Sequence, residues 1–139
     1  MRLNWIDWIA LVLTIIGALN WGLVAFGFNA VAAVFGTPPA LGAVVSYILI
    51  ALAGLWLIYL AYRLASARGF GLNWIDWIAL VLTIVGALNW GLVAFGVDIG
   101  GTIPPVPTLS VVVYILIGLS GLWLIYLAYR AAVSRAPVV

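Results

Sequence analysis

The chain has 139 residues, of which 68% are hydrophobic and 6% are charged, and its formal net charge is +2. Soluble domains carry about 25% charged residues, and a soluble fold of this composition would expose large apolar patches. There is no cysteine and no histidine. This inventory excludes disulfides and Cys/His metal sites, predicts a protein without a cofactor, and disfavours an enzyme. Five arginines are too few to form a phosphate-tracking surface, so a nucleic-acid partner is not expected.

Two long blocks of the sequence occur twice, with one substitution in the first block and two in the second. The copies follow each other in the same order, so the chain is a tandem duplication. Repeat 1 comprises residues 1–68 and repeat 2 comprises residues 69–139. The matching blocks are residues 3–26 with 72–95, and residues 47–63 with 114–130.

Each block predicts one membrane span. About 20 apolar residues in a helix cross the hydrocarbon core of a bilayer, and none of the blocks contains proline. The predicted fold class is therefore an all-α integral membrane protein with four transmembrane helices, arranged as two tandem hairpins in the same orientation. The predicted spans are residues 6–26, 44–62, 75–95 and 111–129.

The arginines predict the orientation of these spans. With four spans, all five arginines fall on one side, and the opposite loops, residues 27–43 and 96–110, contain none. The positive-inside rule then places both termini in the cytoplasm of a multi-pass cell-membrane protein. In the first of the opposite loops, residues 29–35 are apolar and predict a short helix at the outer interface.

The aromatic residues recur near the ends of the spans, where membrane proteins concentrate tryptophan and tyrosine. Trp5, Trp8, Tyr59 and Tyr62 are expected at the cytoplasmic boundary. Trp21 and Tyr47 are expected near the outer boundary, and repeat 2 supplies matching residues for both groups. Trp56 and Trp123 lie deeper, so we expect them to pack on a neighbouring helix or to face lipid.

Two acidic residues stand in the first turn of a span. Asp7 and Asp76 are favoured there by the helix N-terminus, and Arg63 and Arg130 end the partner helices at the same depth. We predict an interfacial ion pair across each hairpin. The alternative interpretation of these carboxylates is an entry site for protons or cations.

Small and polar residues form the candidate contact faces of the spans. Thr14, Gly17, Asn20 and Trp21 are repeated as Thr83, Gly86, Asn89 and Trp90. Membrane helices associate through such residues, which predicts helix packing; a pore-facing or ligand-facing amide and a locally broken helix are the alternatives. On the second and fourth spans we expect one packing face in each repeat, with Gly54 and Gly121 as points of close approach. These faces are Tyr47, Ala51, Gly54, Ile58 and Ala61, and Tyr114, Gly118, Gly121, Ile125 and Ala128.

The sequence resembles a known family at several motifs. Leu-Asn-Trp-Gly-Leu-Val at residues 19–24 and 88–93, preceded by Asp-Trp-Ile-Ala-Leu, is similar to domain-of-unknown-function family 378, which comprises small two-span membrane proteins of prokaryotes. Tyr-Ile-Leu-Ile-x-Leu-x-Gly-Leu-Trp, at residues 47–56 and 114–123, resembles that family's second span. The resemblance covers both repeats and implies a two-span hairpin in each, but no established activity.

The pattern favours a non-enzymatic membrane protein that self-assembles, as a homo-oligomer, through its small and polar helix faces and has a structural or scaffolding role. One alternative is an oligomeric channel or small-solute pathway lined by Asn20, Asn89, Thr14 and Thr83. Another alternative is an accessory subunit of a larger membrane complex, which it would contact through Trp56 and Trp123.

Overall fold

A computed structural model describes residues 2–99 and 107–134, and this part of the chain is helical. Four of its helices are long and apolar enough to cross a membrane, which confirms the predicted fold class. The fifth is the short helix predicted in the first outer loop. The helices are α1 (Trp5–Val24), α2 (Ala30–Phe35), α3 (Leu41–Ser66), α4 (Trp74–Val93) and α5 (Pro107–Val133). Helices α3 and α5 extend several residues beyond the spans predicted at 44–62 and 111–129.

The first helix of each repeat begins at the same capping box. The Asn4 side chain accepts a hydrogen bond from the Asp7 backbone N–H at 2.9 Å, and the Asp7 carboxylate accepts one from the Asn4 N–H at 2.8 Å. Asn73 and Asp76 repeat the arrangement at α4. These bonds satisfy N–H groups that the first helical turn leaves free. The asparagine and aspartate, three residues apart, therefore fix where each helix starts.

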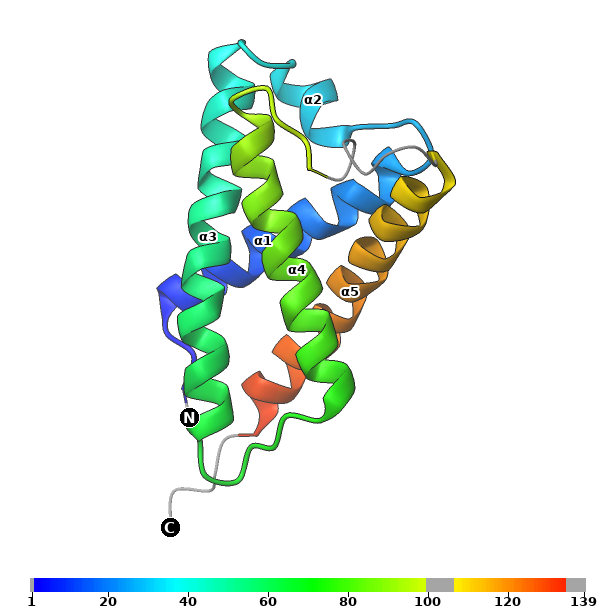
Figure 1. The fold of residues 1–139 in the computed structure, drawn as a ribbon. Coiled ribbons are helices and arrows are strands. Elements are labelled where there is room, and N and C mark those ends of the chain that lie inside the picture. The colour runs from blue at the N-terminus through cyan, green and yellow to red at the C-terminus, as the bar shows by residue number, and fades with distance from the viewer. Residues whose placement is uncertain (1, 100–106, 135–139) are drawn as a thin grey trace.

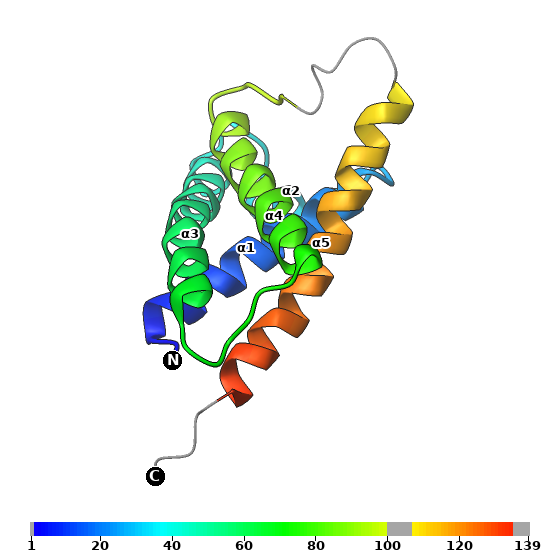
Figure 2. The same cartoon turned by 60° about the horizontal axis from the view of Figure 1, so that its bottom comes forward.

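The two repeats pack mainly against each other. Helix α1 has its most extensive contacts with α5, and α3 has its most extensive contacts with α4, so each major contact joins different repeats. Figures 1 and 2 both show the C-terminal end of α4 beside α3 and the N-terminal end of α4 close to α5. The hairpin mates therefore meet at the arginine-bearing end of the bundle and separate toward the other end, which we call the outer end.

Glycines make the contacts between repeats close. A Cβ atom at Gly54 would lie 2.8 Å from Cβ of Ala87, and one at Gly121 would lie 2.9 Å from Cβ of Ala18. Both distances are too short for a side chain, so these positions require glycine unless a helix shifts. The close approach is made to a helix of the other repeat, which the sequence left open.

The interior is divided into two clusters of buried residues. Leucines fill the half nearer the arginines, and aromatic and small residues fill the outer half. Both predicted packing faces are wrong in part, because Ile58 and Ile125 are about half exposed, at 49% and 48%. Leu57 and Leu60 are buried in place of Ile58. Lipid is as apolar as isoleucine, so composition alone does not determine which apolar side of a span turns inward.

Candidate functional site

Four aromatic rings form a continuous stack in the outer half of the interior. The rings of Trp21 and Trp90 lie 4.0 Å apart between centroids, with 19° between their planes. Tyr114 stacks on Trp21 at 4.7 Å, and Tyr47 stacks on Trp90 at 4.6 Å. The order Tyr47–Trp90–Trp21–Tyr114 alternates between the repeats, so the stack belongs to both of them.

Each tryptophan of the stack also donates a hydrogen bond to the other repeat. Nε1 of Trp21 donates to the Gly86 carbonyl oxygen, and Nε1 of Trp90 donates to the Gly17 carbonyl oxygen, both at 2.9 Å. A Cβ atom at Gly17 would lie 3.2 Å from the Trp90 ring and 2.6 Å from Ile50. Gly17 and Gly86 therefore provide both the acceptor and the space that the indole of the other repeat needs.

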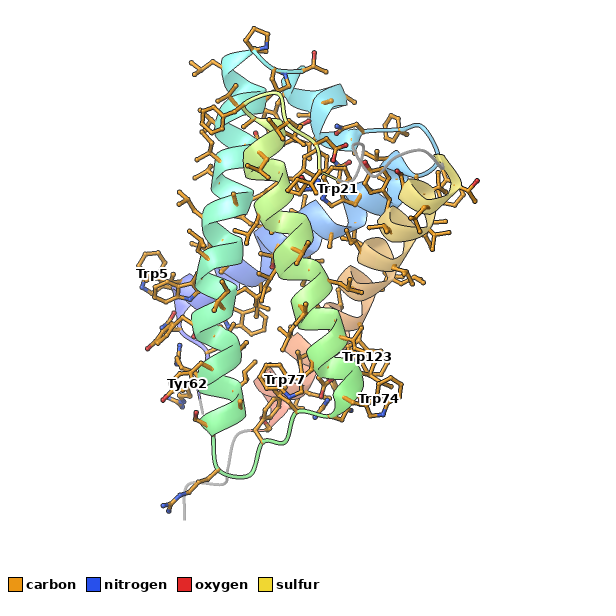
Figure 3. The ribbon with its side chains drawn as sticks, in the orientation of Figure 1. Trp5, Trp21, Tyr62, Trp74, Trp77 and Trp123 are labelled. Atoms are coloured by element: carbon orange, nitrogen blue, oxygen red, sulfur yellow. The ribbon has the colours of Figure 1, made fainter. Side chains whose placement is uncertain are left out.

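The burial of these aromatic residues corrects the expectation that their polar atoms face the membrane interface. Trp21 and Trp90 are 2% and 1% exposed, and Tyr47 is 1% exposed. Figure 3 shows Trp21 among the helices, whereas Trp5 and Trp74 project away from the bundle. An indole N–H favours the interface because it finds a partner there, but the carbonyls of Gly17 and Gly86 supply that partner inside the bundle.

Asn20 and Asn89 join the end of a helix to the loop that follows it. In repeat 1 the Asn20 amide donates to Asn29 Oδ1 at 2.8 Å and its oxygen accepts from the Ala30 N–H at 2.8 Å; Asn29 in turn donates to the Tyr47 hydroxyl at 3.0 Å. Repeat 2 has the same arrangement with Asp98 in place of Asn29. Asn89 donates to Asp98 at 2.8 Å, and the Tyr114 hydroxyl donates to it at 2.7 Å. The two amides thus bond within their own repeat.

The two predicted threonines are buried near the middle of their helices. The Thr14 hydroxyl donates to the carbonyl oxygens of Ala10 and Leu11, at 2.8 and 3.1 Å. The Thr83 hydroxyl is buried without a partner among the described residues. Neither threonine is exposed to a polar channel, since both are fully buried.

The predicted Asp–Arg pairs are brought together at the opposite end of the bundle. Nη1 of Arg63 donates to both carboxylate oxygens of Asp7 at 2.9 Å, and Arg130 does the same to Asp76 at 3.0 and 2.8 Å. Both carboxylates are fully buried, whereas the arginine side chains are 22% and 24% exposed. Each pair joins the two helices of one hairpin, so we call it the clasp of that repeat.

Trp56 and Trp123 complete the clasps, a role that we did not predict from the sequence. Nε1 of Trp56 donates to Asp7 at 3.0 Å, and Nε1 of Trp123 donates to Asp76 at 2.8 Å. Each tryptophan precedes the clasp arginine of its helix by seven residues, which is two helical turns. That spacing was the available signal, because it places both side chains on the face that carries the arginine.

We expect Trp56→Phe to lower the free energy of unfolding by about 1–2 kcal/mol, because a buried carboxylate loses one of its donors. Trp123→Phe should have the same effect in repeat 2. Equilibrium unfolding in mixed detergent micelles measures the change. Trp5→Phe is the control, since Trp5 is 71% exposed. An equal loss in the control would show that the bond to Asp7 contributes nothing.

The helices, the repeat and the reciprocal contacts define a four-span helical membrane protein built from two copies of one hairpin. The chain belongs to the family of domain of unknown function DUF378, whose profile matches residues 4–62 and again residues 73–129. The two matches agree with the tandem duplication, and the family's name records no function.

One curated relative supports the same assignment. The chain is 52% identical over 48 residues to the uncharacterized membrane protein YuzA of Bacillus subtilis strain 168. The match covers 34% of this chain and 62% of the relative, so the chain spans less than two thirds of the relative's length, and the relative is roughly as long as one repeat. No solved structure matches the chain.

Proposed function

We propose that this protein is a non-enzymatic structural membrane protein whose two repeats assemble with each other, through their small and polar faces, into one closed four-helix unit. The observation that carries the proposal is the reciprocal bond from each stacked tryptophan to a glycine carbonyl of the other repeat. The unit has the contacts that two copies of a single-repeat protein would make on forming a symmetric dimer. Fusing the copies removes the need for a second chain to find the first.

The polar groups that would serve a channel or an enzyme are engaged in holding this unit together. Asn20 and Asn89 bond to their own loops, and Asp7 and Asp76 bond to clasp arginines. Leucines that are at most 3% exposed fill the half of the interior nearer the arginines. This packing supports a structural role better than a pathway through the four helices.

Assembly of several chains stays a prediction. Assembly was expected on the small and polar helix faces, and on these faces Gly17, Gly86, Gly54 and Gly121 each contact the other repeat of the same chain. A larger homo-oligomer or a complex with other subunits would therefore use the outward faces, which carry leucine, isoleucine and valine. We further propose, from the arginines at the clasp end, that this end and both termini face the cytoplasm.

The cysteine-free chain allows a direct test of the proposed closure. We expect Ala51→Cys with Gly91→Cys to form a disulfide within one chain. A Cβ atom at Gly91 would lie 2.7 Å from Cβ of Ala51, and a disulfide needs about 3.8 Å between the Cβ atoms, so the two helices must part by about 1 Å. With a protease site inserted beside the exposed Arg68, the oxidised and cleaved protein should keep its full mass on a non-reducing gel. The control pair Ile58→Cys with Ile125→Cys faces outward and should fall into halves.

In the oxidised protein before cleavage, a band of twice the mass would mean that the repeats of different chains pack together, which contradicts closure within one chain. Two half-size bands from the Ala51/Gly91 pair would contradict the contact itself. Wherever the cleaved halves run together, reduction should separate them, which would show that the disulfide holds them.

A further inference from the structure

A groove opens between α4 and α5 in the outer half of the bundle, where the hairpin mates separate. It has a volume of about 400 Å³, within the range typical of ligand sites. Its lining is almost entirely apolar and includes Val85, Leu88, Leu92, Val113 and Ile117. Val85 is 54% exposed and Leu92 is 39% exposed, so the groove is open at its rim toward the surrounding lipid.

In repeat 1 a short helix packs beside the outer part of the hairpin. Helix α2 packs against both α3 and α1, and its Val31 is 8% exposed beside Ala43 and Tyr47. In repeat 2 the described residues after α4 reach only Ile99, which lines the groove, and they form no helix.

A carboxylate stands at the edge of this groove. Asp98 accepts hydrogen bonds from Asn89 and Tyr114, both of which line the groove, and it replaces Asn29 of repeat 1. Among the described residues Asp98 makes no ion pair, and the described arginines all lie on segments at the opposite end of the bundle. A carboxylate offers about four acceptor positions, and two of them are used here. The remaining positions suit a cationic donor.

We propose that the groove binds one phosphatidylethanolamine molecule from the bilayer, with an acyl chain along the apolar walls and the ammonium group hydrogen-bonded to Asp98. A primary ammonium donates charge-assisted hydrogen bonds to a carboxylate, whereas phosphatidylcholine has no N–H to donate and phosphatidylglycerol has no cation. The headgroup contact therefore selects among lipids that share the same tails.

The test is native mass spectrometry of the delipidated full chain with equal amounts of palmitoyl-oleoyl phosphatidylethanolamine, phosphatidylcholine and phosphatidylglycerol. We expect one bound phosphatidylethanolamine per chain, retained about tenfold better than phosphatidylcholine, as one charge-assisted hydrogen bond implies. Asp98→Asn, which copies Asn29, should abolish that preference. Equal retention of phosphatidylethanolamine and phosphatidylcholine by the wild type would overturn the proposal.

A groove-filling variant tests the position of the acyl chain. Val85→Trp should reduce bound phosphatidylethanolamine about tenfold, because the indole takes the space of several buried methylenes. Ile16→Trp is the matched control at the equivalent position of repeat 1 and should leave binding unchanged. If Val85→Trp lowers the unfolding midpoint, Leu92→Trp at the other rim replaces it. Unchanged binding in both rim variants, or an occupant that proves to be a second chain, would overturn the proposal.

Discussion

Trp21→Ala should lower the free energy of unfolding by about 3–5 kcal/mol, the usual cost of truncating a buried aromatic residue. The indole is 2% exposed, stacks between Trp90 and Tyr114, and bonds to the Gly86 carbonyl. The substitution removes all three contacts between the repeats at once. Trp90→Ala should cost the same, because its surroundings are those of Trp21 with the repeats exchanged.

The double variant should lose less than the sum of the two single losses. Stacked aromatic pairs contribute about 0.5–1.5 kcal/mol beyond their burial, and that coupling is already lost in either single variant. Unfolding in mixed detergent micelles measures all three changes, and Trp5→Ala with Trp74→Ala is the control, since both are 71% exposed. Additive losses, or losses no larger than those of the controls, would contradict a stack shared between the repeats.

The spans and their number could be predicted because they depend on composition over a long window. A helix of about 20 apolar residues is stable across a bilayer wherever it occurs in the chain, because it spans the hydrocarbon core and its backbone groups hydrogen-bond within the helix. The helix starts were also predictable in part, since Asp7 and Asp76 stand in the first turn, three residues after Asn4 and Asn73. These features are local, so the sequence specifies them without knowledge of what each helix contacts.

The pairing of the helices could not be predicted because the two repeats carry nearly the same faces. Gly54 fits a helix of its own hairpin as well as one of the other repeat, and only the three-dimensional arrangement distinguishes them. The same limit applied to Trp21, whose indole N–H is satisfied either by interfacial water or by a buried carbonyl. Ile58 was misplaced because exposure to lipid carries no penalty for an apolar side chain.

The role of the outer loops was missed although the sequence contains a signal for it. Asn29 and Asp98 occupy equivalent positions at the offset of 69 residues that relates the first blocks of the repeats. Both have side chains that accept hydrogen bonds, and both bond to the asparagine near the end of the preceding helix. The offset of 69 residues was the signal, because it aligns Asn20 with Asn89 and Asn29 with Asp98.

Different interactions stabilise the two ends of the bundle. At the outer end the stack joins the repeats to each other, whereas at the other end the clasps join the two helices within each repeat. Disrupting a clasp should accordingly loosen one hairpin while leaving the contacts between the repeats in place. This separation makes the clasp testable on its own.

Arg63→Met should lower the free energy of unfolding by about 3 kcal/mol, because it leaves the fully buried Asp7 carboxylate without its cation. Arg130→Met should have a matching effect on repeat 2 through Asp76. Arg68→Met is the control, since Arg68 is exposed and its loss removes a charge from the same end of the bundle. Comparable losses at Arg63 and Arg68 would indicate that net charge, and not the clasp, is responsible.

The partner substitution separates the cost of a stranded charge from the value of the ion pair. Asp7→Asn keeps a side chain that can cap the helix and accept from Trp56, but it removes the negative charge. The double variant Asp7→Asn with Arg63→Met should therefore be more stable than Arg63→Met alone, since no buried charge is left unpaired. A double variant less stable than Arg63→Met would mean that each residue stabilises the fold independently, and the clasp would then not act as a pair.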